Sequence, residues 1–172
     1  MLSLKRLLLG FLALMIAFGV LGGSWSRVTA STDTSVREVD IQFEKKIDIA
    51  LGQAGIFMPS SAFAGTLELT REPARMNLEA KFHPRFITRW LEVRVTNLDG
   101  KDEKIAYGLN YVFFQSTRVL KRYFDEGNLA IYRYDAAKKN WVECPSKVIE
   151  KGNKFRMVCI APSFGIYGLA TR

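Results

Sequence analysis

Few side chains in this 172-residue sequence belong to the types that perform catalysis or bind metals. His83 is the single histidine, and Cys144 and Cys159 are the two cysteines. Most zinc sites, iron–sulfur clusters and paired-histidine sites need more such groups together. A serine nucleophile would have to use His83 as its base, and no Gly-x-Ser-x-Gly motif presents such a serine. We therefore predict a protein that is not an enzyme and has no cofactor or metal; a hydrolase with an unrecognised carboxylate pair remains the alternative.

The two cysteines are expected to form a disulfide bond. In a chain that leaves the cytoplasm, thiols meet oxidants and no reducing pool. A two-residue turn at Lys151-Gly152 would place Cys144 directly opposite Cys159 in a hairpin, at a distance that a disulfide spans, although Pro145 could shift this register by a residue. Closing a loop of about fifteen residues would stabilise the fold by roughly 3 kcal/mol. Two buried free thiols are the alternative.

Three acidic residues, Asp99, Asp102 and Glu103, cluster in one predicted loop. Carboxylates in a loop are the ligands that Ca²⁺ prefers, but the ligand order and closing glutamate of a calcium hand are missing. We therefore interpret them as a solvated acidic turn.

Basic residues gather in the second half of the chain, with tyrosines between them. A surface for anionic glycans or lipids would consist of Arg118, Lys121, Arg122, Lys138 and Lys139. Aromatic and basic side chains together also build nucleic-acid grooves. However, Tyr107 and Tyr111 keep phase with Ile105 and Leu109, which predicts a core face, and lysines at turns keep β-proteins soluble. We therefore expect these basic residues to be solvated surface charges that bind no nucleic acid. Binding of an anionic glycan or lipid is the alternative.

The start of the chain has the pattern of a secretory signal. Lys5 and Arg6 precede an apolar run over residues 7–23, and Val28-Thr29-Ala30 provides the small residues of a cleavage site. Residues 1–30 are thus a signal peptide or, if uncleaved, a signal anchor that supplies the protein's one membrane contact. In both cases the rest of the chain functions outside the cytoplasm.

The exported part reads as a β-protein. After a polar linker over residues 31–37, apolar residues alternate from Val39 to Leu51, and alternation returns over 65–70 and over 91–95. The turn at 97–100 predicts a hairpin with residues 105–111. A short helix is expected at 117–126, capped by Ser116 or Thr117 and stopped by Gly127. Further strands are expected at 129–134, 141–144, 147–150, 154–160 and 165–171. We predict one antiparallel β-sandwich of about 8–10 short strands with at most one short helix, spanning residues 38–172.

The chain carries several short motifs in a fixed order. The first motifs are apolar segments with a Pro and a Gly, at residues 56–59 and 62–69. Residues 128–135 then end in Tyr-Asp, and Trp141-Val142 follows them. The last motif, residues 163–169, contains a Phe and a Tyr. With these motifs, residues 56–172 resemble the ZU-type β-sandwich, a module of netrin receptors and ankyrins that is related to the autoproteolytic domain of adhesion receptors. The resemblance implies a non-catalytic interaction or structural module of the cell envelope or extracellular space, with a partner that the sequence does not identify.

Some relatives of that module cleave their own backbone before the last strand, where a histidine, an apolar residue and a serine or threonine follow one another. This chain has Ser163-Phe164-Gly165 at that place, so both the base and the hydroxyl are missing there. We expect the exported chain to stay intact.

Overall fold

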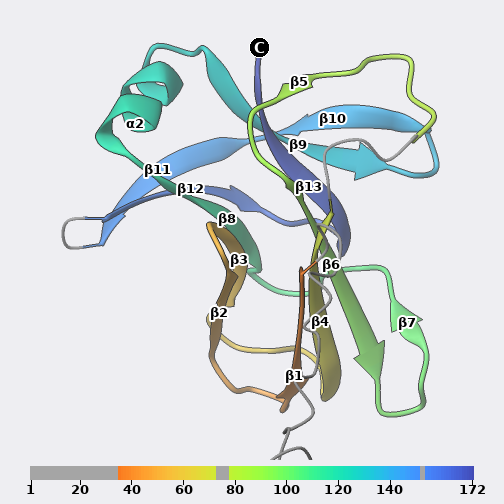
Figure 1. Cartoon of the computed structure of the whole chain (residues 1–172). Helices are drawn as coiled ribbons and strands as arrows, with labels where there is room; N and C mark the ends of the chain where they lie inside the picture. The colour runs from red at the N-terminus through yellow and green to blue at the C-terminus, as the bar shows by residue number, and fades with distance from the viewer. Residues whose placement is uncertain (1–34, 73–77, 152–153) are drawn as a thin grey trace, which may run out of the picture. The chain divides into compact units, whose positions relative to one another are not determined.

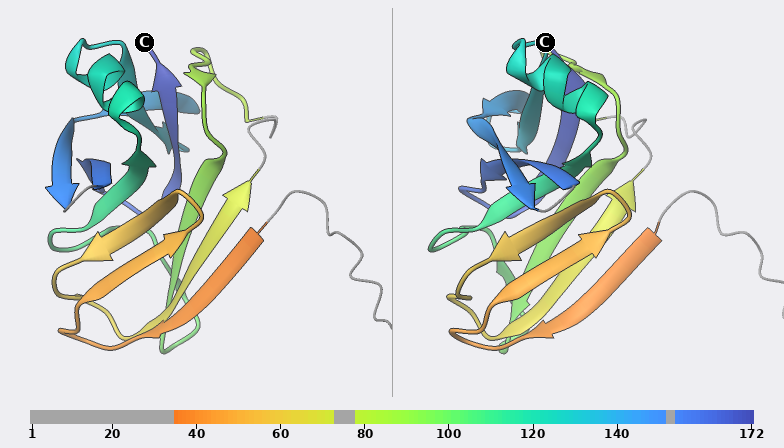
Figure 2. Two further views of the ribbon diagram at one scale, coloured as in Figure 1. Left: turned by 60° about the vertical axis from the view of Figure 1, so that its left-hand side comes forward. Right: turned by 90° about the vertical axis from the view of Figure 1, so that its left-hand side faces the viewer.

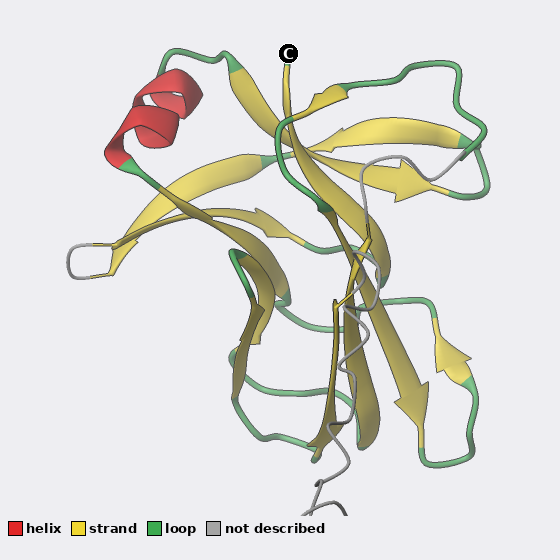
Figure 3. Cartoon of the chain, viewed as in Figure 1, coloured by secondary structure: helices red, strands yellow, loops and turns green. Residues whose placement is uncertain are grey.

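The computed structural model describes residues 35–72, 78–151 and 154–172, which form thirteen strands in two antiparallel sheets and one short helix (Figures 1 and 3). The larger, eight-stranded sheet has the order β1 (Ser35–Ile41), β4 (Gly65–Glu72), β6 (Trp90–Asn97), β13 (Gly165–Thr171), β9 (Leu129–Asp135) and β10 (Asn140–Cys144); β7 (Asp102–Glu103) pairs with β6, and β5 (Arg85–Phe86) with β13. The smaller sheet has the order β11 (Ser146–Lys151), β12 (Lys154–Ile160), β8 (Tyr111–Ser116), β3 (Ala54–Met58) and β2 (Ile47–Leu51). The signal segment, residues 1–30, lies outside the described residues.

The two sheets share one hydrophobic core. Alternate residues of each strand point to one face of a sheet, and on β6 these are Leu91, Val93 and Val95, all buried. The smaller sheet contributes residues such as Ile56 and Val112 to the same cluster. Figure 2 shows the two layers, with β2 and β3 in one and β1, β4 and β6 in the other. The prediction of an antiparallel, all-β fold with one short helix is confirmed for the described residues.

The alternating segment from Val39 to Leu51 is two strands rather than one. β1 ends at Ile41 and belongs to the larger sheet, whereas β2 begins at Ile47 in the smaller sheet. Between them Glu44 has φ 60°, and its N–H donates to the carbonyl of Ser61 at 2.8 Å. β1 also begins at Ser35, so the end of the predicted linker is strand. This split, together with the two-residue strands β5 and β7, raises the strand number above the predicted 8–10.

The predicted hairpin at 91–111 forms over part of its length. β7 pairs with β6, with Val95 opposite Glu103, but residues 104–110 then form a loop that crosses to the smaller sheet. Ile105, Tyr107 and Leu109 are exposed, so the core face predicted for them is wrong. The loop is held by buried Asn110, whose Nδ2 donates to the carbonyl of Tyr107 at 2.8 Å.

The helix α2 (Arg118–Asp125) confirms the predicted helix and its cap. The Thr117 hydroxyl oxygen accepts a hydrogen bond from the Leu120 N–H at 3.3 Å, which satisfies one of the free N–H groups of the first turn. Gly127 has φ 79°, a conformation that glycine adopts without strain, and the chain leaves the helix there.

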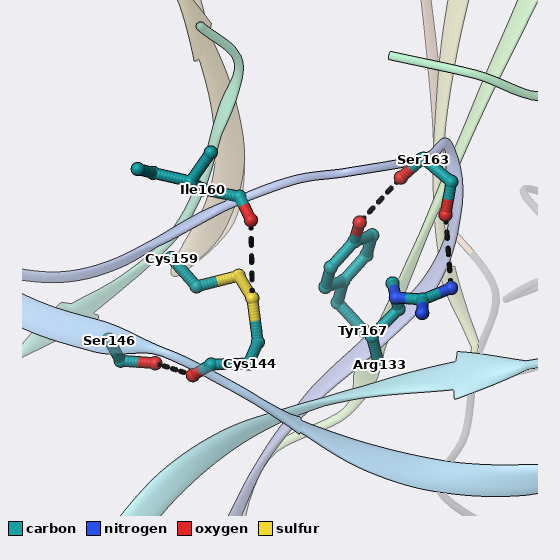
Figure 4. The surroundings of a disulfide bond; sticks show 7 residues. All are labelled: Arg133, Cys144, Ser146, Cys159, Ile160, Ser163 and Tyr167. Atoms are coloured by element: carbon teal, nitrogen blue, oxygen red, sulfur yellow. Dashed lines mark hydrogen bonds between the residues drawn. A yellow bond between two sulfur atoms is a disulfide. The ribbon is translucent and has the colours of Figure 1, made fainter.

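The disulfide between Cys144 and Cys159 is present, with a Cα–Cα distance of 5.9 Å (Figure 4). The predicted register is wrong, because Ser146 lies opposite Cys159 in the β11–β12 ladder. Cys144 ends β10 in the larger sheet, and the chain changes sheets at Pro145, which has no N–H to donate to a ladder. The disulfide therefore joins the two sheets instead of crossing one hairpin.

Candidate binding site on the outer face of the smaller sheet

The smaller sheet carries large apolar side chains on both of its faces. Ile56, Val112 and Met157 point into the core, so their neighbours along the strands point outward. These outward-facing neighbours include Phe57 on β3, Tyr111 and Phe113 on β8, Val158 and Ile160 on β12, and Ile149 on β11. Ile160 is 50% exposed and Ile149 is 40% exposed. The outward face of an antiparallel sheet is usually polar, and an apolar one marks a contact surface.

This outer face contains a hollow of about 290 Å³, which we call the outer groove. It is lined by Lys46, Asp48, Phe57, Pro59, Tyr111, Phe113, Lys147, Ile149, Arg156 and Val158. These residues come from all five strands of the smaller sheet and from the segments that flank β2 and β3. The volume is near the lower end of the range for ligand pockets in proteins, which is about 300 Å³.

Aromatic rings lie at the centre of the outer groove. Phe57 and Tyr111 are directly opposite each other on β3 and β8, and their ring centroids are 5.9 Å apart with 26° between the planes. The Lys46 ammonium lies 5.6 Å from the Phe57 centroid, within the range of a cation–π contact. Gly55 gives Phe113 its space, since a Cβ there would lie 2.6 Å from Phe113 Cζ.

An arginine spans the groove from β12 to β2. The Arg156 guanidinium lies 4.1 Å from the Phe113 ring centroid, and its Nη1 donates to both carboxylate oxygens of Asp48 at 2.9 and 3.2 Å. Arg156 is half-buried and Asp48 is an exposed residue, so the strength of this ion pair comes from its two charge-assisted hydrogen bonds and not from burial. Among the described residues that line the groove, Asp48 is the one acidic residue, against Lys46, Lys147 and Arg156. These four described residues together carry a net charge of +2.

The outer face of the larger sheet is also apolar, but the chain covers it. We call residues 78–89 the cover segment; it contains β5 and packs Leu78, Ala80 and Phe86 against the cluster around Trp90, Tyr132 and Trp141. The Phe86 ring centroid lies 4.6 Å from that of Trp141. Tyr134 donates to the carbonyl of Glu79 at 2.8 Å, which holds the segment down. No described segment covers the outer groove in this way.

The predicted polyanion residues lie in two separate groups. Arg118, Lys121 and Arg122 are on α2, whereas Lys138 and Lys139 are in the turn between β9 and β10. β9 lies between the groups in Figure 1. Seven strand residues extend about 20 Å, which separates the two groups.

Four of these five cations have acidic partners. Within α2 and its C-cap, Lys121 pairs with Asp125 at 2.6 Å and Arg122 with Glu126 at 2.8 Å. In the turn, Lys139 pairs with Glu79 at 2.7 Å, and Lys138 lies 3.8 Å from Asp135. The hydrogen bond that the Lys121 ammonium donates to Asp125 raises the pKa of Lys121 above its usual value, so this lysine stays charged.

The other residues considered from the sequence lie apart from the groove. His83 is exposed in the cover segment. In the acidic turn, Glu103 accepts a hydrogen bond from Asn97 at 2.9 Å, and Asp102 lies 3.6 Å from Lys104. Within the described ranges, no group of three or more histidine, cysteine or acidic side chains is arranged to hold a metal ion. The described part of the chain also contains no helix that combines the length and apolar character needed to cross a membrane.

The Ser163 segment before the last strand is held by Arg133 and Tyr167 (Figure 4). Arg133 Nη1 donates to the Ser163 hydroxyl oxygen at 3.1 Å, and the hydroxyl of fully buried Tyr167 donates to the Ser163 carbonyl at 2.5 Å. Burial raises the pKa of Tyr167 well above its usual value, so this phenol stays protonated. The Ser163 hydroxyl is thus in contact with a cation that cannot act as a base.

The outer groove was not identified from the sequence. The sequence does contain a pattern that indicates an apolar outer face. Ile56-Phe57-Met58 and Val112-Phe113-Phe114 are continuous apolar runs, which are typical of strands buried on both faces. Asp48 and Arg156 are 108 positions apart, and no local pattern brings them together. Comparison with known proteins gives no relative to guide the assignment: no family model, curated protein or solved structure matches this chain.

Proposed function

We propose that this chain is an exported, non-enzymatic interaction module of the cell envelope or extracellular space, and that the outer groove binds its partner protein. The main support is the difference between the outer faces of the two sheets. Both sheets have an apolar outer face, but the cover segment packs on that of the larger sheet, while Ile149 and Ile160 of the smaller sheet stay exposed. Exposing such side chains to water is unfavourable, and a partner would remove that cost.

The composition of the groove supports binding rather than catalysis. Its central residues are aromatic and aliphatic, and its one carboxylate, Asp48, already accepts two hydrogen bonds from Arg156. A general acid or base needs a titratable group within reach of the substrate, and a carboxylate bound in this way is a poor one.

Two observations support a location outside the cytoplasm. The first is the signal-like sequence of residues 1–30, and the second is the disulfide between Cys144 and Cys159, a bond that persists in oxidising compartments. Protein recovered from the producing cell should contain no free thiol and, if the signal is cleaved, should begin near Ser31. Two alkylatable thiols would contradict the proposed location.

We also propose that the domain is a ZU-type β-sandwich. Two antiparallel sheets with a shared core and the strands at residues 129–135, 140–144 and 165–171 are compatible with this assignment.

Covalent footprinting tests whether the groove is covered by a partner. Hydroxyl-radical labelling of Ile149, which is 40% exposed, would be compared between the purified protein and the protein in its producing cells. Ile87 is 41% exposed, lies outside the groove and serves as the matched control. The proposal predicts that Ile149 is protected in cells while Ile87 labels equally in both settings. Equal labelling of Ile149 in both settings would contradict it.

A further inference from the structure

We propose that the outer groove recognises a short peptide segment in which apolar side chains lie between acidic ones. This inference rests on the function proposed above and specifies the chemistry of the partner. It follows from the charges at the two sides of the groove, from the distance between them, and from the side chains at its centre.

The two lysines that line the groove lie at opposite edges of the smaller sheet. Lys147 is on the edge strand β11, and Lys46 directly precedes the edge strand β2. Among the residues that the structure describes, Lys147 has no ion-pair partner. Arg156 is held by Asp48, so the positive charge available to a ligand is that of the lysines. Acidic groups at both ends of a ligand would complement this arrangement.

The width of the sheet gives the length of the ligand. The strand order β11, β12, β8, β3, β2 places four inter-strand spacings between the two edge strands. At about 4.8 Å each, these spacings amount to about 19 Å across the sheet. Through the paired strands Lys147 is in register with Ala50, four residues along the chain from Lys46, which adds about 13 Å along the strand. The Cα atoms of the two lysines are thus about 23 Å apart, and an extended peptide, which rises about 3.3 Å per residue, spans that distance with about seven residues.

The centre of the groove favours apolar side chains over sugars. Between the two lysines lie Phe57, Tyr111 and Val158, with Ile149 at one side. A sugar ring would need several hydrogen-bond partners for its hydroxyls, because polar groups buried without partners are costly. Among the described lining residues, the Tyr111 hydroxyl is the one neutral polar side-chain group, and Asp48 and Arg156 already hydrogen-bond each other, which leaves few partners for sugar hydroxyls between the two lysines. Apolar peptide side chains need no hydrogen-bond partners, and their burial against the aromatic rings is favourable.

The test is selection of random twelve-residue peptides against the full-length protein. The proposal predicts enrichment of peptides that combine Asp or Glu with Leu, Ile, Phe or Trp. The strongest binder, made as a synthetic peptide, should bind Lys46→Glu/Lys147→Glu at least tenfold more weakly than the wild type. A Lys81→Glu/Lys101→Glu variant carries the same change in net charge at exposed positions outside the groove, and it should change the affinity less than twofold. Tyr111→Ser, which leaves the charge unchanged, should also weaken binding.

Several results would overturn the inference: no enriched peptides, enriched peptides without acidic residues, or equal weakening in both charge variants. Binding of heparin or of phosphatidylglycerol vesicles through Lys46 and Lys147, without peptide binding, would also overturn it and would assign a polyanion or lipid surface instead. If no peptide binds but Ile149 is protected in cells, the inference fails while the proposed function stands. If no peptide binds and Ile149 is not protected in cells, both the inference and the proposed function fail.

Discussion

Among individual residues, Cys144 and Cys159 are the pair whose bond links the two sheets covalently. They close a loop with a sequence separation of 15 and tie the larger sheet to the smaller one. Replacing both by alanine should lower the free energy of unfolding by about 3 kcal/mol, because the unfolded chain regains the entropy of the open loop. Urea denaturation measures the change. Reducing the wild type should lower its stability to that of the variant, and equal stability of oxidised wild type and variant would contradict this account.

Tyr167 makes the stability of the fold sensitive to alkaline pH. Burial raises its pKa in the folded protein, while in the unfolded chain the pKa is near the usual value of about 10. The folded state therefore keeps a proton that the unfolded state loses above pH 10, so the stabilisation is complete below pH 10 and declines as the pH rises. The loss should reach about 1.4 kcal/mol per pH unit.

The variant Tyr167→Phe isolates this effect. It should cost about 1 kcal/mol at pH 7, because the hydrogen bond to the Ser163 carbonyl is lost, and it should show a shallower decline above pH 10. Tyr132, whose pKa burial also raises, contributes equally in both proteins. Urea denaturation between pH 8 and 11 measures both slopes, and parallel slopes would show that Tyr167 is not the group responsible.

At the scale of elements, the cover segment is what distinguishes the two outer faces. Phe86 packs against both Trp90 and Trp141, with ring centroids 5.3 and 4.6 Å apart. Phe86→Ala should lower the free energy of unfolding by about 2 kcal/mol, less than for a fully buried phenylalanine because Phe86 is half-buried. It should also increase quenching of tryptophan fluorescence by acrylamide. Unchanged quenching would mean that the segment does not cover this face through Phe86.

Elements with local signals were predictable, and those set by distant contacts were not. The strand at 154–160 and the helix with its Thr117 cap follow from alternation and capping, which depend on neighbouring residues. The break between β1 and β2 depends on hydrogen bonds with Ser61. The loop at 104–110 is held to the segment before β13, where the Phe164 N–H donates to the carbonyl of Lys104 at 3.0 Å and the Ala161 N–H to that of Asn110 at 2.7 Å. In both places the chain changes sheets while the apolar alternation continues, so the pattern alone predicts strand. The pairing of Cys144 with Cys159 could be predicted because the sequence contains two cysteines. The register of the strands around them could not be predicted, because it depends on the change of sheet at Pro145.

At the scale of the whole molecule, the positive charge is expected to act as general surface charge and not as a polyanion site. The cations on α2 and in the β9–β10 turn are apart and mostly ion-paired. Binding to heparin should therefore be weak and should collapse between low salt and 0.15 M, where exposed charges are screened within about 8 Å. Titration at both salt concentrations measures this. Micromolar binding at 0.15 M that is lost when Arg118, Lys121, Arg122, Lys138 and Lys139 are neutralised would assign a polyanion site to them.

Site-specific photo-crosslinking in producing cells would show whether the proposed partner binds at the outer groove. A photo-reactive phenylalanine at position 111 replaces one aromatic ring with another in the middle of the groove. The same residue at position 98 provides the control, since Leu98 is 81% exposed and lies in the turn between β6 and β7. If the groove binds the partner, we expect a discrete adduct from position 111, no such adduct from position 98, and loss of the adduct in Lys46→Glu/Lys147→Glu. No adduct from position 111, or the same adducts from both positions, would contradict it.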